Sequence, residues 1–221
     1  MTIQSSIISD IGPKLTERLV ANPSALAHAA GRLGILAAPA VVLAAASTAA
    51  FGADLPKKIV DTLNFALTLE YIEDAFYRSG LEAKGLIPAK YVGIFNQIGK
   101  HEAAHVALLK GALGKMAVKA PDADFTAGGK YADVFSNFDT FTTLSKTFED
   151  LGVAAYKGQA GNLIENGDIL TVALQIHSVE ARHAAEVRRI RGEKSWDGAF
   201  DEPMTKEAVL AAAKPFLVAA T

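Results

Sequence analysis

The chain has 221 residues, a formal net charge of −2 and no cysteine, and half of its residues are hydrophobic. This length can bury one sizeable core, and the hydrophobic content excludes a chain disordered by composition. The lack of cysteine excludes disulfides, zinc–thiolate sites and cysteine nucleophiles, so a metal site must use histidine and carboxylate ligands. The near-neutral charge gives no electrostatic footprint for nucleic acid, and we expect no nucleic-acid partner.

Residues 1–54 form a region of their own, which we interpret as an N-terminal extension. Residues 31–53 combine a basic flank, an alanine-rich apolar run and small residues at its end, as export signals do. The run starts late, contains Pro39 and follows no twin-arginine pair. Because alanine and glycine contribute little transfer free energy, we expect no firm membrane span. An alanine-rich helix packed on the main body and a degenerate export signal remain alternatives, so the location stays open between the cytoplasm, which we prefer, and an exported compartment.

Four segments within residues 55–192 show the apolar periodicity of long helices. They cover residues 57–80, 89–114, 139–165 and 169–192. Gly80 is expected near the end of the first helix, and Asp168 is expected to cap the start of the fourth. Residues 193–221 form a tail in which Thr205 is expected to cap a last short helix.

The lengths of the three links predict the topology. The first and third links are short and join antiparallel helices, whereas residues 117–138 form a connection rich in turn residues and longer than most links in compact domains. Such a connection lets the second and third helices run parallel. The predicted fold class is therefore all-α, a ferritin-like four-helix bundle with one long crossover over residues 55–192, plus the N-terminal extension and the C-terminal tail.

Two Glu-x-x-His motifs carry the chemical signal. Glu102 and His105 form one, and Glu180 and His183 form the other. Residues three apart lie on one face of a helix, so each pair can point at one spot. Both motifs lie in helices that should be buried, where isolated carboxylates are costly. A pair of divalent metal ions would neutralise them.

One glutamate from each remaining helix completes a two-metal pattern. Bundles that bind two iron or manganese ions take a Glu from each of two helices and a Glu-x-x-His from each of the other two. Glu70 and Glu149 fit this order best, although Glu73 or Asp74 could replace Glu70 and Asp150 could replace Glu149. The predicted metal ligands are Glu70, Glu102, His105, Glu149, Glu180 and His183, with Glu102 and Glu180 as candidates for bridging both ions. No separate catalytic residue is predicted.

Other polar residues lie close to these motifs in the sequence. His101 and His177 could orient a ligand, but the simpler interpretation places both at the surface. Tyr71, Tyr77 and Tyr156 could donate hydrogen bonds near a metal centre, but the simpler interpretation is that they are core aromatic residues.

Several segments resemble a known family. "LNFALTLEYIEDAFY", "HEAAHV", "FEDLGVAAYKGQA" and "IHSVEARHAAEVR" are similar to the four helices of the bacterial ferritin-like domain family that includes desiccation-related proteins. The tail "WDGAFDEPMTKEAVLAAAKPF" is similar to that family's ending, so the resemblance covers about residues 55–217. It implies a four-helix bundle with a carboxylate-bridged site on the positions named above. Members often follow a twin-arginine export signal, which this chain lacks.

The leading functional hypothesis is a di-metal carboxylate protein that binds two iron or manganese ions per chain; zinc would also suit these ligands. Its chemistry would be ferroxidase-like oxidation of Fe²⁺, protecting against oxidative or desiccation stress, and its status as an enzyme stays open. The alternative is a stress-associated structural or interaction bundle with a vestigial or purely structural metal site. A third hypothesis, an oxygenase for a small organic substrate, requires an apolar channel to the site. Metal ions are the expected partners, and assembly of identical chains stays open.

Overall fold

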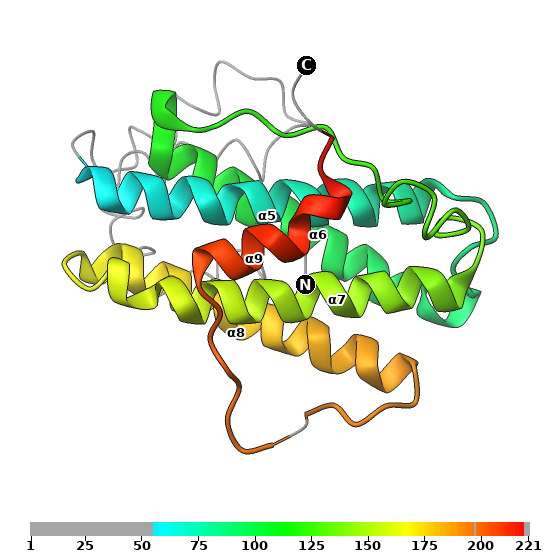
Figure 1. Ribbon diagram of the computed structural model, residues 1–221. Helices are drawn as coiled ribbons and strands as arrows, with labels where there is room; N and C mark the ends of the chain where they lie inside the picture. The colour runs from blue at the N-terminus through cyan, green and yellow to red at the C-terminus, as the bar shows by residue number, and fades with distance from the viewer. Residues whose placement is uncertain (1–54, 197, 219–221) are drawn as a thin grey trace, which may run out of the picture.

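The computed structural model describes residues 55–196 and 198–218, which fold into a bundle of four long helices (Figure 1). These helices are α5 (Lys57–Glu82), α6 (Ala89–Leu113), α7 (Phe138–Gln159) and α8 (Gly167–Ile190). The 3₁₀ turns Gly114–Met116 and Ala160–Asn162 follow α6 and α7, and a short helix α9 (Lys206–Ala213) precedes the turn Lys214–Phe216. The all-α prediction is confirmed. The expected N-terminal extension lies outside the described residues, and the proposed domain boundaries stay a prediction.

The links determine the direction of each helix. Short links join α5 to α6 and α7 to α8, and these two antiparallel pairs pack closely. Residues 117–137 return along the length of the bundle, so that α6 and α7 point the same way (Figure 1). The described part of this crossover contains turns and one isolated β-bridge, between Ala123 and Leu217, rather than strands. The prediction of a long crossover without strands therefore holds for these residues.

Side chains of α5 hold the start of the crossover. The Asn64 amide donates to the Met116 carbonyl at 2.9 Å and accepts from the Val118 amide at 2.8 Å. The Tyr71 hydroxyl donates to the Val118 carbonyl at 3.3 Å. These bonds satisfy backbone groups just after the end of α6, where hydrogen-bond partners within the helix are lacking.

Two predicted helix ends are wrong: the third helix, α7, ends at Gln159 rather than at residue 165, and Asp168 does not cap α8. Helix α5 ends at Glu82, two residues after Gly80 and close to the predicted end. The absent side chain of Gly80 makes room for a neighbour, since a Cβ at position 80 would lie 2.3 Å from Cε2 of the fully buried Phe141. Helix α8 is capped by Asn166, whose side chain accepts from the Ile169 amide at 3.1 Å, rather than by Asp168. Asp168 instead lies in the first turn, where a negative charge interacts favourably with the helix dipole.

The C-terminal tail packs back onto the bundle. The Thr205 side chain caps α9, as predicted, by accepting from the Ala208 amide at 3.2 Å. Helix α9 lies over α5 and α7 (Figure 1) and contacts α7. The Met204 amide donates to the Ala154 carbonyl at 3.1 Å, and Gly158 of α7 lies directly under the Met204 carbonyl. A side chain on Gly158 would therefore exclude the tail.

Apolar clusters flank a buried polar layer in the middle of the bundle. One cluster contains Phe76, Phe95 and Phe141 and extends to Phe216 near the C-terminus. The other, which contains Leu63 and other aliphatic residues of α5, α6 and α8, lies toward the start of α5. Among the described helices, none is both long and apolar enough to span a membrane.

Candidate metal centre

The six predicted ligands are buried together between the four long helices. The four glutamates are 0 % exposed, and His105 and His183 are 8 % and 5 % exposed. Their candidate ligand atoms form two groups, each with all atoms within 4.8 Å of one another: Glu70, Glu102, His105 and Glu180 in one, and Glu102, Glu149, Glu180 and His183 in the other. Glu102 and Glu180 belong to both groups. The fold thus brings the six residues together, and metal binding by them stays a prediction.

Both histidines direct the same ring nitrogen into the centre. His105 Nδ1 lies 3.1 Å from Glu70 Oε2 and 3.0 Å from Glu180 Oε1. His183 Nδ1 lies 2.9 Å from Glu102 Oε1 and 3.2 Å from Glu149 Oε2. Each Glu-x-x-His spacing places its two side chains on one helix face, as expected. Equivalent donor sets therefore face each other across the bundle.

The alternative acidic residues are engaged elsewhere. Asp74 pairs with Arg78 one turn along α5, at 3.0 Å. Asp150 accepts two bonds from the Arg188 guanidinium, at 2.6 and 2.7 Å. This bidentate pairing directs Asp150 away from the centre. Geometry therefore favours Glu70 and Glu149 as the donors from α5 and α7.

Two buried tyrosines hold the outer oxygens of these two glutamates. Tyr156 of α7 donates to Glu70 Oε1 at 2.5 Å. Tyr77 of α5 donates to Glu149 Oε1 and also lies 2.6 Å from the Ser145 hydroxyl. Tyr77 lies seven residues after Glu70 on α5, and Tyr156 lies seven residues after Glu149 on α7. Each tyrosine nevertheless bonds the glutamate of the other helix. The inner oxygens, Oε2 in both glutamates, remain directed at the histidines.

The carboxylates shared by the two groups have unsatisfied oxygens. Both oxygens of Glu180 and Oε1 of Glu102 are buried without a hydrogen bond. Glu102 Oε1 is close to His183 Nδ1, at 2.9 Å, but not in hydrogen-bonding direction. Buried carboxylate oxygens without partners are costly, and cations between the helices would satisfy them. The donor set therefore fits a pair of divalent metal ions.

Burial and mutual charge shift the pKa values in this cluster. Burial raises the pKa of Glu70 to about 7, and burial together with the charge of Glu102 raises the pKa of Glu180 well above its ordinary value. Burial would also raise the pKa of Glu102, but the neighbouring His105 and His183 outweigh it and lower that pKa. Burial lowers the pKa of the two histidines, yet the surrounding carboxylates outweigh it and raise both well above the ordinary range. In the metal-free protein Glu70, Glu180 and the two histidines therefore retain protons that bound metal would displace.

Glu73 is a fifth buried acidic side chain at this centre, 3 % exposed. A Cβ built on Gly152 would lie 3.2 Å from Glu73 Oε1 and 3.3 Å from Glu180 Oε2. Glu73 thus occupies space beside Glu180 that the absent side chain of Gly152 leaves open. From the sequence, Glu73 is expected only as a substitute for Glu70, although their spacing of three places both on one helix face.

His101 is not the surface residue that the sequence suggested. Its Nδ1 lies 2.9 Å from His183 Nε2, and the two nearly parallel rings meet edge to edge with centroids 5.1 Å apart. The surface interpretation is therefore wrong for His101. His177 is half-buried near the charges of Lys157 and Asp201.

A model of the ferritin-like domain matches residues 58–193, which include α5 to α8 and all six predicted ligands. The chain belongs to the ferritin-like family. No curated protein matches the chain. The family match confirms the resemblance to a ferritin-like domain, and the buried Glu/His groups resemble the di-metal sites of such bundles.

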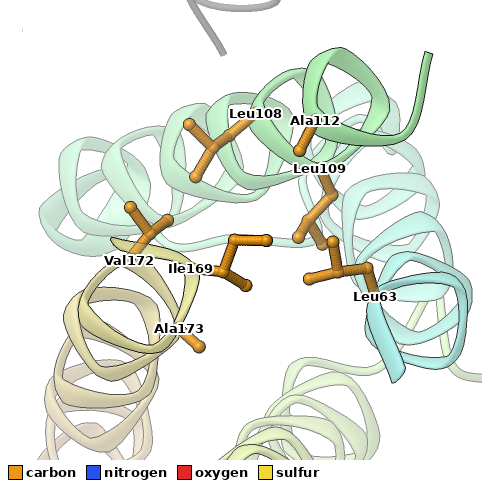
Figure 2. A pocket seen from close by; sticks show the side chains of 7 residues that line it. All are labelled: Leu63, Leu108, Leu109, Ala112, Ile169, Val172 and Ala173. Carbon is orange, nitrogen blue, oxygen red and sulfur yellow. The ribbon is translucent and has the colours of Figure 1, made fainter. Parts of the chain in front are cut away.

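A small pocket lies at one end of this ferritin-like bundle (Figure 2). Its lining is entirely apolar and comes from α5, α6 and α8: Leu63, Leu108, Leu109, Ala112, Ile169, Val172 and Ala173. Along α5, Leu63 lies seven residues before Glu70, which corresponds to about 10 Å of helix. None of the six predicted ligands lines this small pocket, so it does not supply the apolar channel to the site that the oxygenase hypothesis requires.

Proposed function

We propose that this chain binds two divalent metal ions, iron or manganese, between its four long helices and oxidises Fe²⁺, protecting the cell against oxidative or desiccation stress. The observation that carries the proposal is the pair of overlapping donor groups that share Glu102 and Glu180. A single-ion site would need only one such group. The unsatisfied oxygens of the same two glutamates support the same arrangement.

Each half of the centre has its own terminal ligands. Glu70 and His105 would hold one ion, Glu149 and His183 would hold the other, and Glu102 and Glu180 would bridge them. Four carboxylates balance the charge of two divalent ions, and carboxylate with imidazole suits iron and manganese, although zinc would also fit. When bound, an iron pair would supply the electrons that O₂ or peroxide accepts.

The protein's own groups keep the ligands in place and limit access by water. Tyr77 and Tyr156 fix the outer oxygens of Glu149 and Glu70. Complete burial of the four glutamates excludes bulk water, which strengthens their interaction with cations. Because the histidines present Nδ1 to the centre, their Nε2 atoms remain available to other partners.

The test is metal content and Fe²⁺ oxidation in Glu102→Ala and Glu180→Ala proteins. Each substitution removes a donor common to both groups, so we expect loss of stoichiometric binding of two ions and loss of Fe²⁺ oxidation. The matched control is Glu186→Ala, which removes a glutamate of α8 that pairs with Arg189 at 2.6 Å. Metal content should be measured on protein purified without added metal and after reconstitution.

Wild-type metal content and oxidation rate in both variants would refute the two-metal proposal. The buried motifs would then be hydrogen-bonding groups of a structural bundle. Binding of two ions without Fe²⁺ oxidation would leave a structural metal site and refute the oxidation step alone.

A further inference from the structure

One half of the centre has an additional hydrogen-bonded connection to the surface. The inner nitrogen of His183 faces the carboxylates, while its Nε2 lies 2.9 Å from His101 Nδ1. The far nitrogen of His101, Nε2, lies 2.7 Å from the side-chain amide nitrogen of Gln97. His183 is buried, His101 is partly buried and Gln97 is exposed. Three side chains therefore lead from the centre to solvent.

The corresponding position in the other half cannot make this connection. His101 precedes His105 of its own helix by four residues, and the residue four before His183 on α8 is Val179. A valine side chain has no hydrogen-bonding group. The rings of His101 and His183 are also nearly parallel, with an interplanar angle of 14°, so the bond between their edges restricts the tilt of His183. His183 therefore has a hydrogen-bonding partner on its outer nitrogen that the equivalent position, Val179, cannot provide to His105.

Metal binding would select one direction for these hydrogen bonds. A histidine that binds metal through Nδ1 is neutral and carries its proton on Nε2. That N–H group would donate to His101 Nδ1, so His101 would carry its own proton on Nε2 and donate it to the Gln97 amide oxygen. Since the two ends of a glutamine amide can exchange by rotation, Gln97 can supply this acceptor.

We propose that His101 is a positioning residue for the half of the centre formed by Glu149 and His183, and that it makes this half the tighter of two unequal metal sites. This inference rests on the proposed two-metal function. His101 acts by holding the ring angle and the tautomer of His183, and partners of this kind change metal affinity by roughly 10–100-fold.

The test uses Co²⁺ as the probe and the full-length protein stripped of metal. We expect calorimetric titration of the wild type to show two unequal binding steps. His101→Leu removes the acceptor and should weaken the tighter step by about 10–100-fold while leaving the other. His101→Asn retains an acceptor oxygen and should restore most of the loss. His177→Leu, the same change at a half-buried histidine of α8, is the control and should leave both steps unchanged.

A spectroscopic signal separates positioning from a general structural role. In the Co²⁺ protein, the ring N–H of a histidine ligand gives a shifted proton resonance, and its bond to His101 should slow exchange with solvent. We expect one such slowly exchanging signal in the wild type and in His101→Asn, and its loss in His101→Leu. If the leucine variant does not fold, the asparagine variant decides, because loss of the slow signal there would overturn the inference.

Other outcomes distinguish the inference from the function on which it rests. Two-ion binding that is insensitive to His101→Leu, or a loss shared equally by both steps and not restored by asparagine, overturns the positioning role alone. A wild-type protein that binds no Co²⁺ overturns the two-metal function and this inference with it.

Discussion

Gly152 is the one position on α7 where the absence of a side chain leaves room for two acidic groups, Glu73 and Glu180. Gly152→Ala would place a methyl group 3.2–3.3 Å from an oxygen of each, so these carboxylates must shift. We expect metal affinity to fall several-fold, with no loss in the free energy of unfolding, because alanine favours helix over glycine by about 0.5–1 kcal/mol.

Calorimetric metal titration with denaturant unfolding checks this prediction. Gly93→Ala is the control, since Gly93 lies within α6 with open space around it. Unchanged metal affinity in Gly152→Ala would mean that the position of Glu73 and Glu180 has no bearing on the centre.

Tyr156 contributes a hydrogen bond that no water can replace, because its partner Glu70 is 0 % exposed. Tyr156→Phe should lower the free energy of unfolding of the metal-free protein by about 1–3 kcal/mol, as expected when a buried acceptor loses its donor. Urea unfolding measures the change. Tyr71→Phe, which removes a longer bond to the Val118 carbonyl, should stay within about 0.5 kcal/mol. Equal effects of the two substitutions would contradict this account.

At the scale of elements, α7 has to contact the centre on one side and the C-terminal tail on another. Gly158→Ala would place a Cβ 1.9 Å from the Met204 carbonyl oxygen, which is backbone and cannot move aside alone. We expect the tail to detach from α7, which would break the bond from the Met204 amide to Ala154. The four long helices should remain folded.

Limited proteolysis provides the measurement for this substitution. Cleavage within residues 198–218 should become much faster in Gly158→Ala than in wild type, with little change in helical circular dichroism. Gly161→Ala, at a position with open space, should behave as wild type. An equally protected tail in both variants would show that α7 does not hold it through this contact.

At the scale of the whole molecule, the buried centre makes the stability of the metal-free protein depend on pH. The folded chain binds more protons than the unfolded one between pH 6 and 8, because the pKa values of Glu180, His105 and His183 are raised well above their ordinary values and that of Glu70 is raised to about 7. The histidine contribution is complete below the ordinary pKa of 6.5 and is lost as pH rises through the folded value. The buried glutamates with raised pKa values destabilise the folded state increasingly as pH rises above their ordinary pKa of 4.5. The lowered pKa of Glu102 does not change how the free energy of unfolding depends on pH between pH 6 and 8, because Glu102 is ionised there in both the folded and the unfolded chain.

We therefore expect the free energy of unfolding of the metal-free protein to fall from pH 6 to pH 8. Binding of Mn²⁺ releases the retained protons, so metal affinity should rise over the same range and oppose the decline. Urea unfolding at several pH values, with and without Mn²⁺, tests both. Glu180→Gln should reduce the slope in the metal-free protein, and stability that instead rises toward pH 8 would refute the assignment of these pKa shifts.

Much of the fold and of the candidate site could be predicted from the local spacing of residues in the sequence. Helical period, the link lengths and the two Glu-x-x-His motifs predicted the bundle, the crossover and the six residues that meet at its centre, because a helix fixes which of its own residues share a face. The same local rules failed at the end of the third helix and at Asp168. The third helix tightens into the 3₁₀ turn Ala160–Asn162, and Asn166, a residue with equal capping ability, takes the cap position expected for Asp168.

The sequence by itself determined which side chains each helix directs inward, and the tertiary structure decided which of them meet. Tyr77 bonds Glu149 across 72 residues, and His101 contacts His183 across 82. Such contacts depend on the rotation and register of one helix against another. Apolar periodicity sets those quantities only approximately, whereas a hydrogen bond requires atoms to meet within a few tenths of an ångström.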